Sequence, residues 1–342
     1  MLPKKMKAIV AKKFGDPVSI EEMPVKEPGD DEILVKVMAS GVCHTDLHAI
    51  DGDWPVKPKL PLIPGHEGVG YVAAAGKNVK NVKEGDAVGV PWLYSACGTC
   101  EHCITGWETL CEEQDNAGYS VDGGYAEYVI ADPRYVGHLP SNVNFAEMAP
   151  ILCAGVTVYK GLKETDTRPG EWVAISGIGG LGHLAVQYAK AMGLHVAAID
   201  VADDKLNLAK KLGAELTVNA MEEDPGEYLK KETGGMHGAL VTAVAPQAFT
   251  QALSTLRRKG TLAMNGLPPG SFELDIFNAV LNRITIRGSI VGTRKDLQES
   301  IDFATQGKVK SNIKTEKMEN INAVLDDMRK NKIEGRMVLQ VA

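Results

Sequence analysis

The sequence is 342 residues long, a length at which a chain usually divides into two domains. Its content of 44% hydrophobic, 24% charged and 6% aromatic residues is typical of a globular protein and excludes a disordered or fibrous one. Its 37 basic and 44 acidic residues give a formal charge of −7, and without a basic stripe this charge argues against nucleic acid as a partner.

The first part of the chain, residues 1–150, has the pattern of an irregular, mostly β domain. Short apolar runs such as 33–42 and 123–131 predict strands, and the glycine, proline and aspartate residues between such runs predict turns. The opening residues lack the apolar stretch of a signal peptide, and no apolar run is long enough to span a membrane. We therefore expect a cytoplasmic protein with no membrane partner.

Four cysteines fall within fifteen positions of this first part, in the spacing C-x2-C-x2-C-x7-C. Disulfides are disfavoured by the expected compartment and by strain between such close cysteines. An iron–sulfur cluster shares the first three positions, but the ferredoxin pattern has its fourth cysteine three residues later, followed by proline. The spacing favours a closed, purely structural zinc site. Its expected ligands are Cys97, Cys100, Cys103 and Cys111.

From about residue 150 to 290 the pattern changes to alternating strands and helices, which predicts parallel strands joined by helical crossovers in a doubly wound sheet. The expected elements are strand 171–176, helix 180–193, strand 195–200 and helix 202–214, followed by further alternation through 215–220, 238–244, 246–260 and 261–266. The tail predicts helices over 295–307 and 320–330 and a strand over 335–341, and we expect it to return to the first domain.

The segment "GIGGLG" has the pattern G-x-G-x-x-G between a predicted strand and a predicted helix. Backbone N–H groups at such a helix start can bind a pyrophosphate. Asp200 ends the next strand, where a carboxylate receives the adenosine ribose hydroxyls and repels the extra phosphate of NADP, so NAD is favoured. The expected cofactor-binding loop residues are Gly177, Gly179, Gly180, Leu181 and Gly182.

The remaining two cysteines, Cys43 and Cys153, lie far apart in the sequence, with His66 between them. Each has an ordinary alternative, because single cysteines are often simply buried and a single histidine is more often hydrogen-bonded than metal-bound. Together they form a Cys2His set, which leaves zinc a fourth position for water or substrate.

The motifs "GVCHTDLH", "GHEGVG", the four-cysteine loop and "GIGGLG", in this order, resemble the zinc-dependent medium-chain alcohol dehydrogenases over essentially the whole chain. Among them the sequence is most similar to the bacterial and yeast ethanol-oxidising members. The resemblance implies an α/β fold with a Rossmann-type doubly wound domain, residues 151–290. It also implies a mostly β GroES-like catalytic domain, residues 1–150, completed by residues 291–342.

The resemblance further implies two zinc ions per chain, one structural and one catalytic. The catalytic ion would be held by Cys43, His66 and Cys153, with Glu67 as an occasional ligand. Asp46 would accept a hydrogen bond from the far nitrogen of His66 and fix its tautomer, the alternative being a simple turn carboxylate.

Other site residues are also implied by the resemblance. The hydroxyl of Thr45 would start a proton path that continues through the nicotinamide ribose to His48. Trp54 and Trp92 would line a narrow pocket for short primary alcohols, or else belong to the core.

Three basic residues are similar to cofactor contacts of the family. His44 and Arg336 resemble residues on the pyrophosphate side, and Lys205 resembles a lysine that contacts the ribose. Because histidine is charged only part of the time near neutral pH, the contact of His44 should be weaker than that of arginine. Lys205 and Arg336 could equally be solvated charges.

The expected activity is therefore reversible hydride transfer between a short primary alcohol and NAD, giving an aldehyde and NADH. The alternative within the fold is a polyol, threonine or formaldehyde dehydrogenase. A redox-responsive or nucleic-acid-binding zinc protein is a rival of another class, and the acidic charge argues against it. The resemblance also suggests a homotetramer.

Overall fold

The computed structural model describes residues 2–342. Internal contacts divide the chain into two compact units. The first consists of residues 1–153, 293–305 and 311–342, and the second of residues 154–292 and 306–310.

The first unit is built around a seven-stranded sheet in which β16, β17, β3, β4, β5 and β9 lie side by side and β8 also pairs with β3. All of these pairs are antiparallel except β16 with β17. Two small two-stranded sheets, β1 with β2 and β6 with β7, complete the unit. Its strands are β1 (Lys5–Val10), β2 (Ser19–Pro24), β3 (Ile33–Val42), β4 (Gly68–Ala75), β5 (Ala87–Val90), β6 (Leu93–Ser95), β7 (Asp115–Asn116), β8 (Tyr128–Ala131), β9 (Gly137–Leu139), β16 (Ile313–Lys317) and β17 (Arg336–Gln340).

Short helices connect these strands. They are α1 (His44–Asp51), α2 (Glu101–Ile104), α3 (Phe145–Met148), α10 (Arg294–Thr305) and α11 (Ile321–Arg329), together with the 3₁₀ helices η1 (Glu108–Leu110), η2 (Ala149–Leu152) and η3 (Met318–Asn320).

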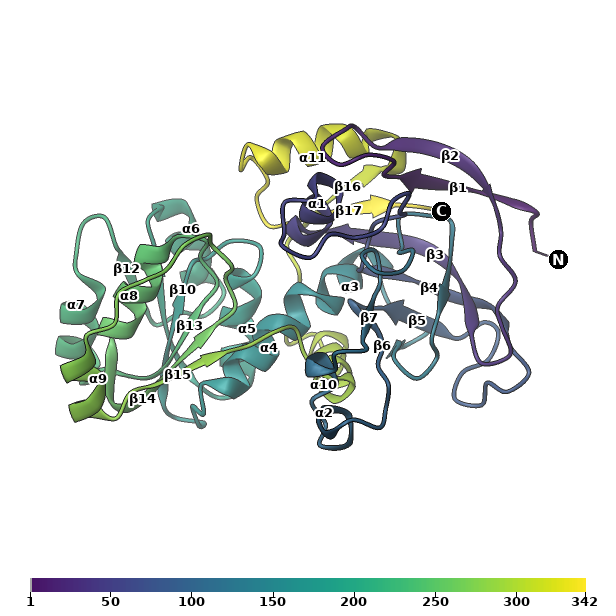
Figure 1. Ribbon diagram of the computed structural model, residues 1–342. Coiled ribbons are helices and arrows are strands. Elements are labelled where there is room, and N and C mark those ends of the chain that lie inside the picture. The colour runs from purple at the N-terminus through teal and green to yellow at the C-terminus, as the bar shows by residue number, and fades with distance from the viewer. Residues whose placement is uncertain (1) are drawn as a thin grey trace. The chain divides into compact units, whose positions relative to one another are not determined.

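The central strand β3 is almost continuously buried, as expected for a strand covered on both faces. The chain's last strand, β17, pairs with β3, so the C-terminal segment completes a sheet formed mainly by residues 33–139 (Figure 1). Pairing of Met337 with Val42 and of Ser40 with Gly68 aligns the C-terminal end of β3 with the N-terminal ends of β17 and β4. This edge of the sheet carries most of the site described below.

The second unit holds a six-stranded sheet in the order β12, β11, β10, β13, β14, β15, with every pair parallel. Chain order reverses between β10 and β13, which is the doubly wound Rossmann arrangement. Its elements are α4 (Ala154–Glu164), β10 (Trp172–Ser176), α5 (Gly182–Ala191), β11 (His195–Asp200), α6 (Asp203–Lys211), β12 (Leu216–Asn219), α7 (Pro225–Thr233), β13 (Met236–Val241), α8 (Pro246–Ser254), β14 (Leu256–Met264), α9 (Ile276–Asn282) and β15 (Thr285–Gly288). The predicted α/β fold class is confirmed.

Some local features of this unit differ from the sequence analysis. The run 246–260 was expected as one element before the strand 261–266, but α8 ends at Ser254 and residues 256–260 already belong to β14. Helix α7 was not predicted, although the side chain of Asp224 caps it, Pro225 opens it and Gly234 ends it at φ 78°. These are ordinary helix boundary signals, and the charged sequence between them obscured the apolar period.

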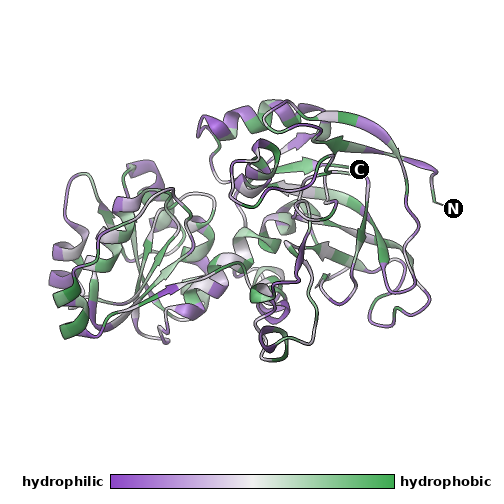
Figure 2. Ribbon diagram, viewed as in Figure 1, coloured by the Kyte–Doolittle hydropathy of each residue, from purple (hydrophilic) through white to green (hydrophobic). Residues whose placement is uncertain are grey.

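Apolar residues concentrate in the central strands of this sheet, which Figure 2 shows in green. Helix α9 is also largely green, but its apolar side chains are exposed, with Ile276 75% and Phe277 74% accessible. Within residues 2–342, every helix is too short or too polar to cross a lipid bilayer.

Candidate active site

The aligned edge of β17, β3 and β4 places three functional side chains together. Cys43 directly follows β3, Glu67 directly precedes β4, and Arg336 is the first residue of β17. His66 immediately precedes Glu67, and Cys153 directly follows η2. Strand pairing thus brings together residues that are up to about three hundred positions apart in the sequence.

Cys43, His66, Glu67 and Cys153 form one buried cluster in which each offers a metal-ligating atom within 4.8 Å of the others. The two sulfur atoms are 4.0 Å apart. Two thiolates bound to one tetrahedral zinc ion would be about 3.8 Å apart, given Zn–S bonds of about 2.3 Å. Their mutual hydrogen bond lowers the pKa of Cys43 and raises that of Cys153. A cation between them is what would let both be thiolates, so the donor set fits zinc.

His66 is oriented for metal binding by Asp46. Its Nδ1 lies 2.7 Å from Oδ1 of Asp46, which as a carboxylate can only accept, so Nδ1 carries the proton. Burial is the largest single influence on the pKa of His66 and lowers it, but the charge and hydrogen bond of Asp46, together with the contact with Cys43, raise the pKa well above its usual value overall. The other nitrogen, Nε2, is buried and has no hydrogen-bond partner among residues 2–342. A bare, buried imidazole nitrogen facing two cysteines is what a metal ligand requires.

Asp46 is in turn held by three further donors. The backbone N–H groups of Cys43 and Gly65 donate to it at 2.9 and 3.2 Å, and the hydroxyl of Tyr125 donates to it at 2.9 Å. Its side chain is completely buried. Asp46 thus contacts His66 as well as the backbone of its own turn. Tyr125 was not predicted, because its sequence context indicates only a strand.

Glu67 pairs with Arg336, and both side chains are buried. Burial raises the pKa of Glu67 to about 7, although the charge of Arg336 acts in the opposite direction. The second carboxylate oxygen of Glu67 has no partner among the described residues. It occupies the space next to Gly41, where a Cβ atom would lie 1.7 Å from it. Arg336 is therefore not a solvated charge, and Gly41 provides the room for Glu67.

The residues of the predicted proton path lie on α1. The hydroxyl of Thr45 is 3.8 Å from the sulfur of Cys43. His48 is one turn further along, with its ring partly exposed and hydrogen-bonded to Asp53, a residue that the sequence did not single out. His44 opens the helix and is exposed.

Aromatic side chains form a continuous wall from His48 to His66. Trp54 stacks on His48 with ring centroids 4.9 Å apart, and Trp92 meets His66 edge-on at 5.4 Å. Tyr119, which sequence analysis missed, lies between them, 5.7 Å from Trp54 and 5.4 Å from Trp92. Trp92 therefore borders the metal-ligating cluster, whereas Trp54 lies beside His48.

The four clustered cysteines also converge. Their sulfur atoms lie within 4.8 Å of one another, and those of Cys97 and Cys103 are 3.9 Å apart, again close to the separation expected around zinc. All six cysteines of the chain are free, so the disfavoured disulfides are absent. Backbone N–H groups of Thr99 and Cys100 lower the pKa of Cys97 to about 6, which favours its thiolate.

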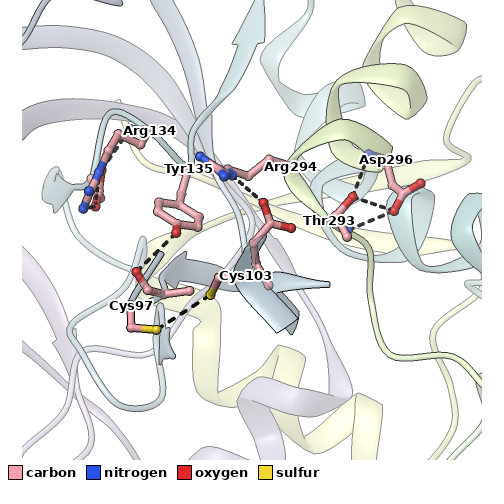
Figure 3. Close-up of polar contacts among 10 residues, drawn as sticks. Cys97, Cys103, Arg134, Tyr135, Thr293, Arg294 and Asp296 are labelled. Carbon is pink, nitrogen blue, oxygen red and sulfur yellow. Dashed lines mark hydrogen bonds and ion pairs between the residues drawn. The ribbon is translucent and has the colours of Figure 1, made fainter. Parts of the chain in front are cut away.

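Side chains outside the cysteine cluster also contact this loop, and Figure 3 shows several of these contacts. The hydroxyl of Tyr135 donates to the carbonyl of Ala96 at 3.3 Å. Arg294, at the start of α10, stacks over the ring of Tyr135 at 4.7 Å and donates to the buried carboxylate of Glu108 at 2.7 Å. The small apolar cluster of the loop consists mainly of the cysteines themselves. A metal ion would thus replace the hydrophobic core that the loop lacks.

In the second unit, the glycine-rich loop connects β10 to α5. Gly177 has φ 90°, and a Cβ atom on Gly182 would lie 1.8 Å from the carbonyl oxygen of Gly177. A Cβ atom on Gly179 would meet nothing within 4 Å, so the space beside the backbone is open at this position. The loop therefore fits a pyrophosphate.

Asp200, at the end of β11, lies against this loop. It accepts the N–H of Ile178 at 2.6 Å and those of Val201 and Ala202 at 2.8 and 3.1 Å. The ammonium group of Lys205 is 4.0 Å from it. The structure thus places the predicted ribose-side residues beside the predicted phosphate loop.

Comparison with known proteins gives two family matches. Residues 29–141 match the alcohol dehydrogenase GroES-like domain, and residues 180–306 match the zinc-binding dehydrogenase domain. The chain is 66% identical to an alcohol dehydrogenase from Moraxella sp. (strain TAE123), covering 98% of this chain and 99% of the relative. It is 61% identical to an alcohol dehydrogenase from Rhizobium meliloti, with coverage of 98% and 99%.

Solved structures agree with these matches. The alcohol dehydrogenase of Aeropyrum pernix superposes with a TM-score of 0.88 at 34% identity, covering 98% of this chain and 99% of its own. Acetophenone reductase from Geotrichum candidum, in complex with NAD, gives 0.86 at 30%, with coverage of 99% and 98%. A Helicobacter pylori protein named CAD, complexed with NADP(H), gives 0.88 at 27%, with coverage of 99% of both chains. With the sequence motifs and the fold in agreement, the chain belongs to the zinc-dependent medium-chain alcohol dehydrogenases, a family of oxidoreductases.

Proposed function

We propose that this alcohol dehydrogenase binds two zinc ions and oxidises short primary alcohols such as ethanol reversibly with NAD. The observation that supports this most directly is the buried cluster of Cys43, His66 and Cys153, with the bare Nε2 of His66 directed into it. Three such ligands leave zinc one open position, whereas the four-cysteine loop leaves none. The first site is therefore proposed as catalytic and the second as structural.

The chain's own residues prepare this site for an alcohol. Zinc, when bound, acts as a Lewis acid that lowers the pKa of a hydroxyl group. Asp46 holds His66 in the tautomer that presents Nε2. Glu67 lies close enough to act as an additional ligand. When it does not bind the metal, its ion pair with Arg336 holds its side chain in place.

Thr45 and His48 are proposed to handle the proton. The Thr45 hydroxyl, close to Cys43, would accept it from the alcohol at Oγ1. His48 would hold it at Nε2 before it passes to solvent, to which the ring is partly exposed. The aromatic wall of Trp54, Tyr119 and Trp92 favours a narrow, apolar substrate site and hence short alcohols.

NAD is the proposed hydride acceptor, bound at the loop of residues 177–182. The named structures include complexes with NAD and with NADP(H), so fold alone leaves the choice open. Asp200 favours NAD, because its carboxylate would repel a ribose phosphate. Lys205 is proposed as a ribose contact. The contacts of His44 and Arg336 with the pyrophosphate stay predictions.

A direct test is the formation of NADH, followed by absorbance, across a panel of alcohols. We expect the highest kcat/KM with ethanol-sized primary alcohols and loss of turnover after treatment with 1,10-phenanthroline, followed by recovery with added zinc. Preference for polyols, threonine or the formaldehyde–glutathione adduct would instead favour the alternative dehydrogenase types. Turnover unaffected by complete zinc removal would contradict the proposal.

The cofactor choice is tested separately by Asp200→Asn. The amide oxygen can still accept the N–H of Ile178, but the negative charge is lost. We expect the ratio of kcat/KM for NAD to that for NADP to fall about tenfold or more, which corresponds to about 1.4 kcal/mol. Asp204→Asn on the exposed side of α6 is the matched control and should keep the ratio. An unchanged ratio in Asp200→Asn would show that NAD is selected elsewhere.

We also propose a homotetramer in the cytoplasm. Helix α9 presents an exposed apolar face, and β15 lies at the edge of its sheet with one side unpaired among the described residues. Exposed apolar patches and open sheet edges favour association between subunits. The cytoplasm would keep reduced the six cysteines that the two metal sites require.

A further inference from the structure

His48 is held on two sides by the residues that follow its helix. Its Nδ1 lies 2.9 Å from Oδ1 and 3.1 Å from Oδ2 of Asp53, and its ring stacks on Trp54 with an interplanar angle of 23°. Gly52 makes this possible, because its φ of 64° ends α1 and turns the chain back toward the helix. The segment 52–54 thus restrains the plane of the His48 ring and provides the hydrogen-bond partner of its Nδ1.

A carboxylate accepts hydrogen bonds and cannot donate them. The contact with Asp53 therefore stabilises the tautomer of His48 that carries its proton on Nδ1, and it leaves Nε2 as the acceptor. Stacking on Trp54 opposes the ring flip that would exchange the two nitrogens.

The neighbouring acid cannot take the place of Asp53. Asp51, on the other side of Gly52, is engaged by Arg329, with oxygen–nitrogen distances of 2.7 and 3.3 Å. Of the two acids that flank Gly52, only Asp53 contacts His48.

We propose that Asp53 is a positioning residue that holds His48 in the Nδ1–H tautomer, so that Nε2 is available for the proton released by the alcohol. This inference rests on the proposed function, which assigns the proton to His48. The effect should be moderate, since the side chain of Asp53 is 55% exposed and solvent competes for the contact. We expect a change of about tenfold rather than the change of about ten thousandfold seen for a buried catalytic triad.

The experiment compares Asp53→Ala and Asp53→Asn with Asp51→Asn as the matched control, all in the zinc-loaded protein. The tautomer is read from ¹⁵N chemical shifts of protein labelled in its histidines, with His48→Gln to assign the signal. We expect the Nδ1–H form in the unmodified protein and in Asp51→Asn, and a tautomer mixture in Asp53→Ala. Asp53→Asn should be intermediate, because its amide can both accept and donate.

Turnover is measured as the single-turnover rate of NADH formation, which product release cannot mask. We expect Asp53→Ala to slow this rate about tenfold with KM nearly unchanged, and to have no further effect in a His48→Gln background. An unchanged tautomer, or an equal loss in both backgrounds, would overturn the assignment of Asp53. If His48→Gln itself turned over normally, the proton path of the proposed function would fail, and with it the consequence drawn for Asp53.

Discussion

Replacing Cys43 by alanine is expected to lower kcat by at least about a thousandfold, because Lewis-acid stabilisation of several kcal/mol is lost with the metal. The remaining ligands would be His66, Cys153 and Glu67, which lack the strand-anchored thiolate. We expect metal analysis to show one zinc ion per chain instead of two, with the ion of the four-cysteine loop retained.

The fold should survive this change, since Cys43 lies at the end of β3 and its backbone N–H still donates to Asp46. Val42→Ala is a matched control, because it truncates a neighbouring buried side chain without removing a ligand. It should cost about 1 kcal/mol or somewhat more in stability and keep both metal ions. Cys43→Ala that retained two zinc ions and turned over normally would show that Cys43 is not a ligand.

Replacing Cys97 by serine is expected to produce the largest loss of stability. Structural zinc contributes about 10–16 kcal/mol of apparent binding free energy in small zinc domains, and part of this is lost with one ligand. For a loss of several kcal/mol we expect the melting temperature to fall by roughly 10 °C, using about 2–4 °C per kcal/mol. Calorimetry together with zinc analysis measures both effects.

The chemical step should be much less affected, because Cys97 belongs to a separate ligand cluster from Cys43. At temperatures well below melting we expect kcat within a few-fold of the unmodified protein. Ile104→Ala, a 71% exposed position on the same loop, is the control and should leave melting unchanged. Normal melting combined with lost catalysis would contradict a structural function of the loop.

Much of the fold could be predicted because the signals are local. The strand, glycine loop and helix over residues 172–191 follow one another directly, and Asp200 ends the next strand. The end of α8 was not predicted, because residues 257–259 are charged and only Leu256 of this stretch pairs with β13, ahead of an irregularity in the register of the two strands. Pairing of this kind depends on tertiary structure and leaves little trace in a short window of sequence.

The residues of the candidate site likewise include some that the sequence indicated and some that it did not. Resemblance to a family supported the candidates Cys43, His66 and Cys153. These residues are far apart in the sequence, and nothing in their spacing indicates that they are close in space. Tyr125 and Asp53 were missed because each takes part in the site through a single side-chain contact, and neither belongs to a sequence motif. The contact of Tyr125 with Asp46 joins positions 79 residues apart, and no pattern of spacing predicts it.

The hydrogen-bond network around Asp46 has a consequence for how the protein would acquire the two zinc ions proposed above. Every donor in that network belongs to the polypeptide, so the apo protein can hold the imidazole of His66 ready before any ion arrives. Such preorganisation would let a catalytic ion exchange without refolding of the protein. The cysteine loop has few apolar residues besides the cysteines themselves, so an ion bound there would take part in folding the loop and should exchange more slowly.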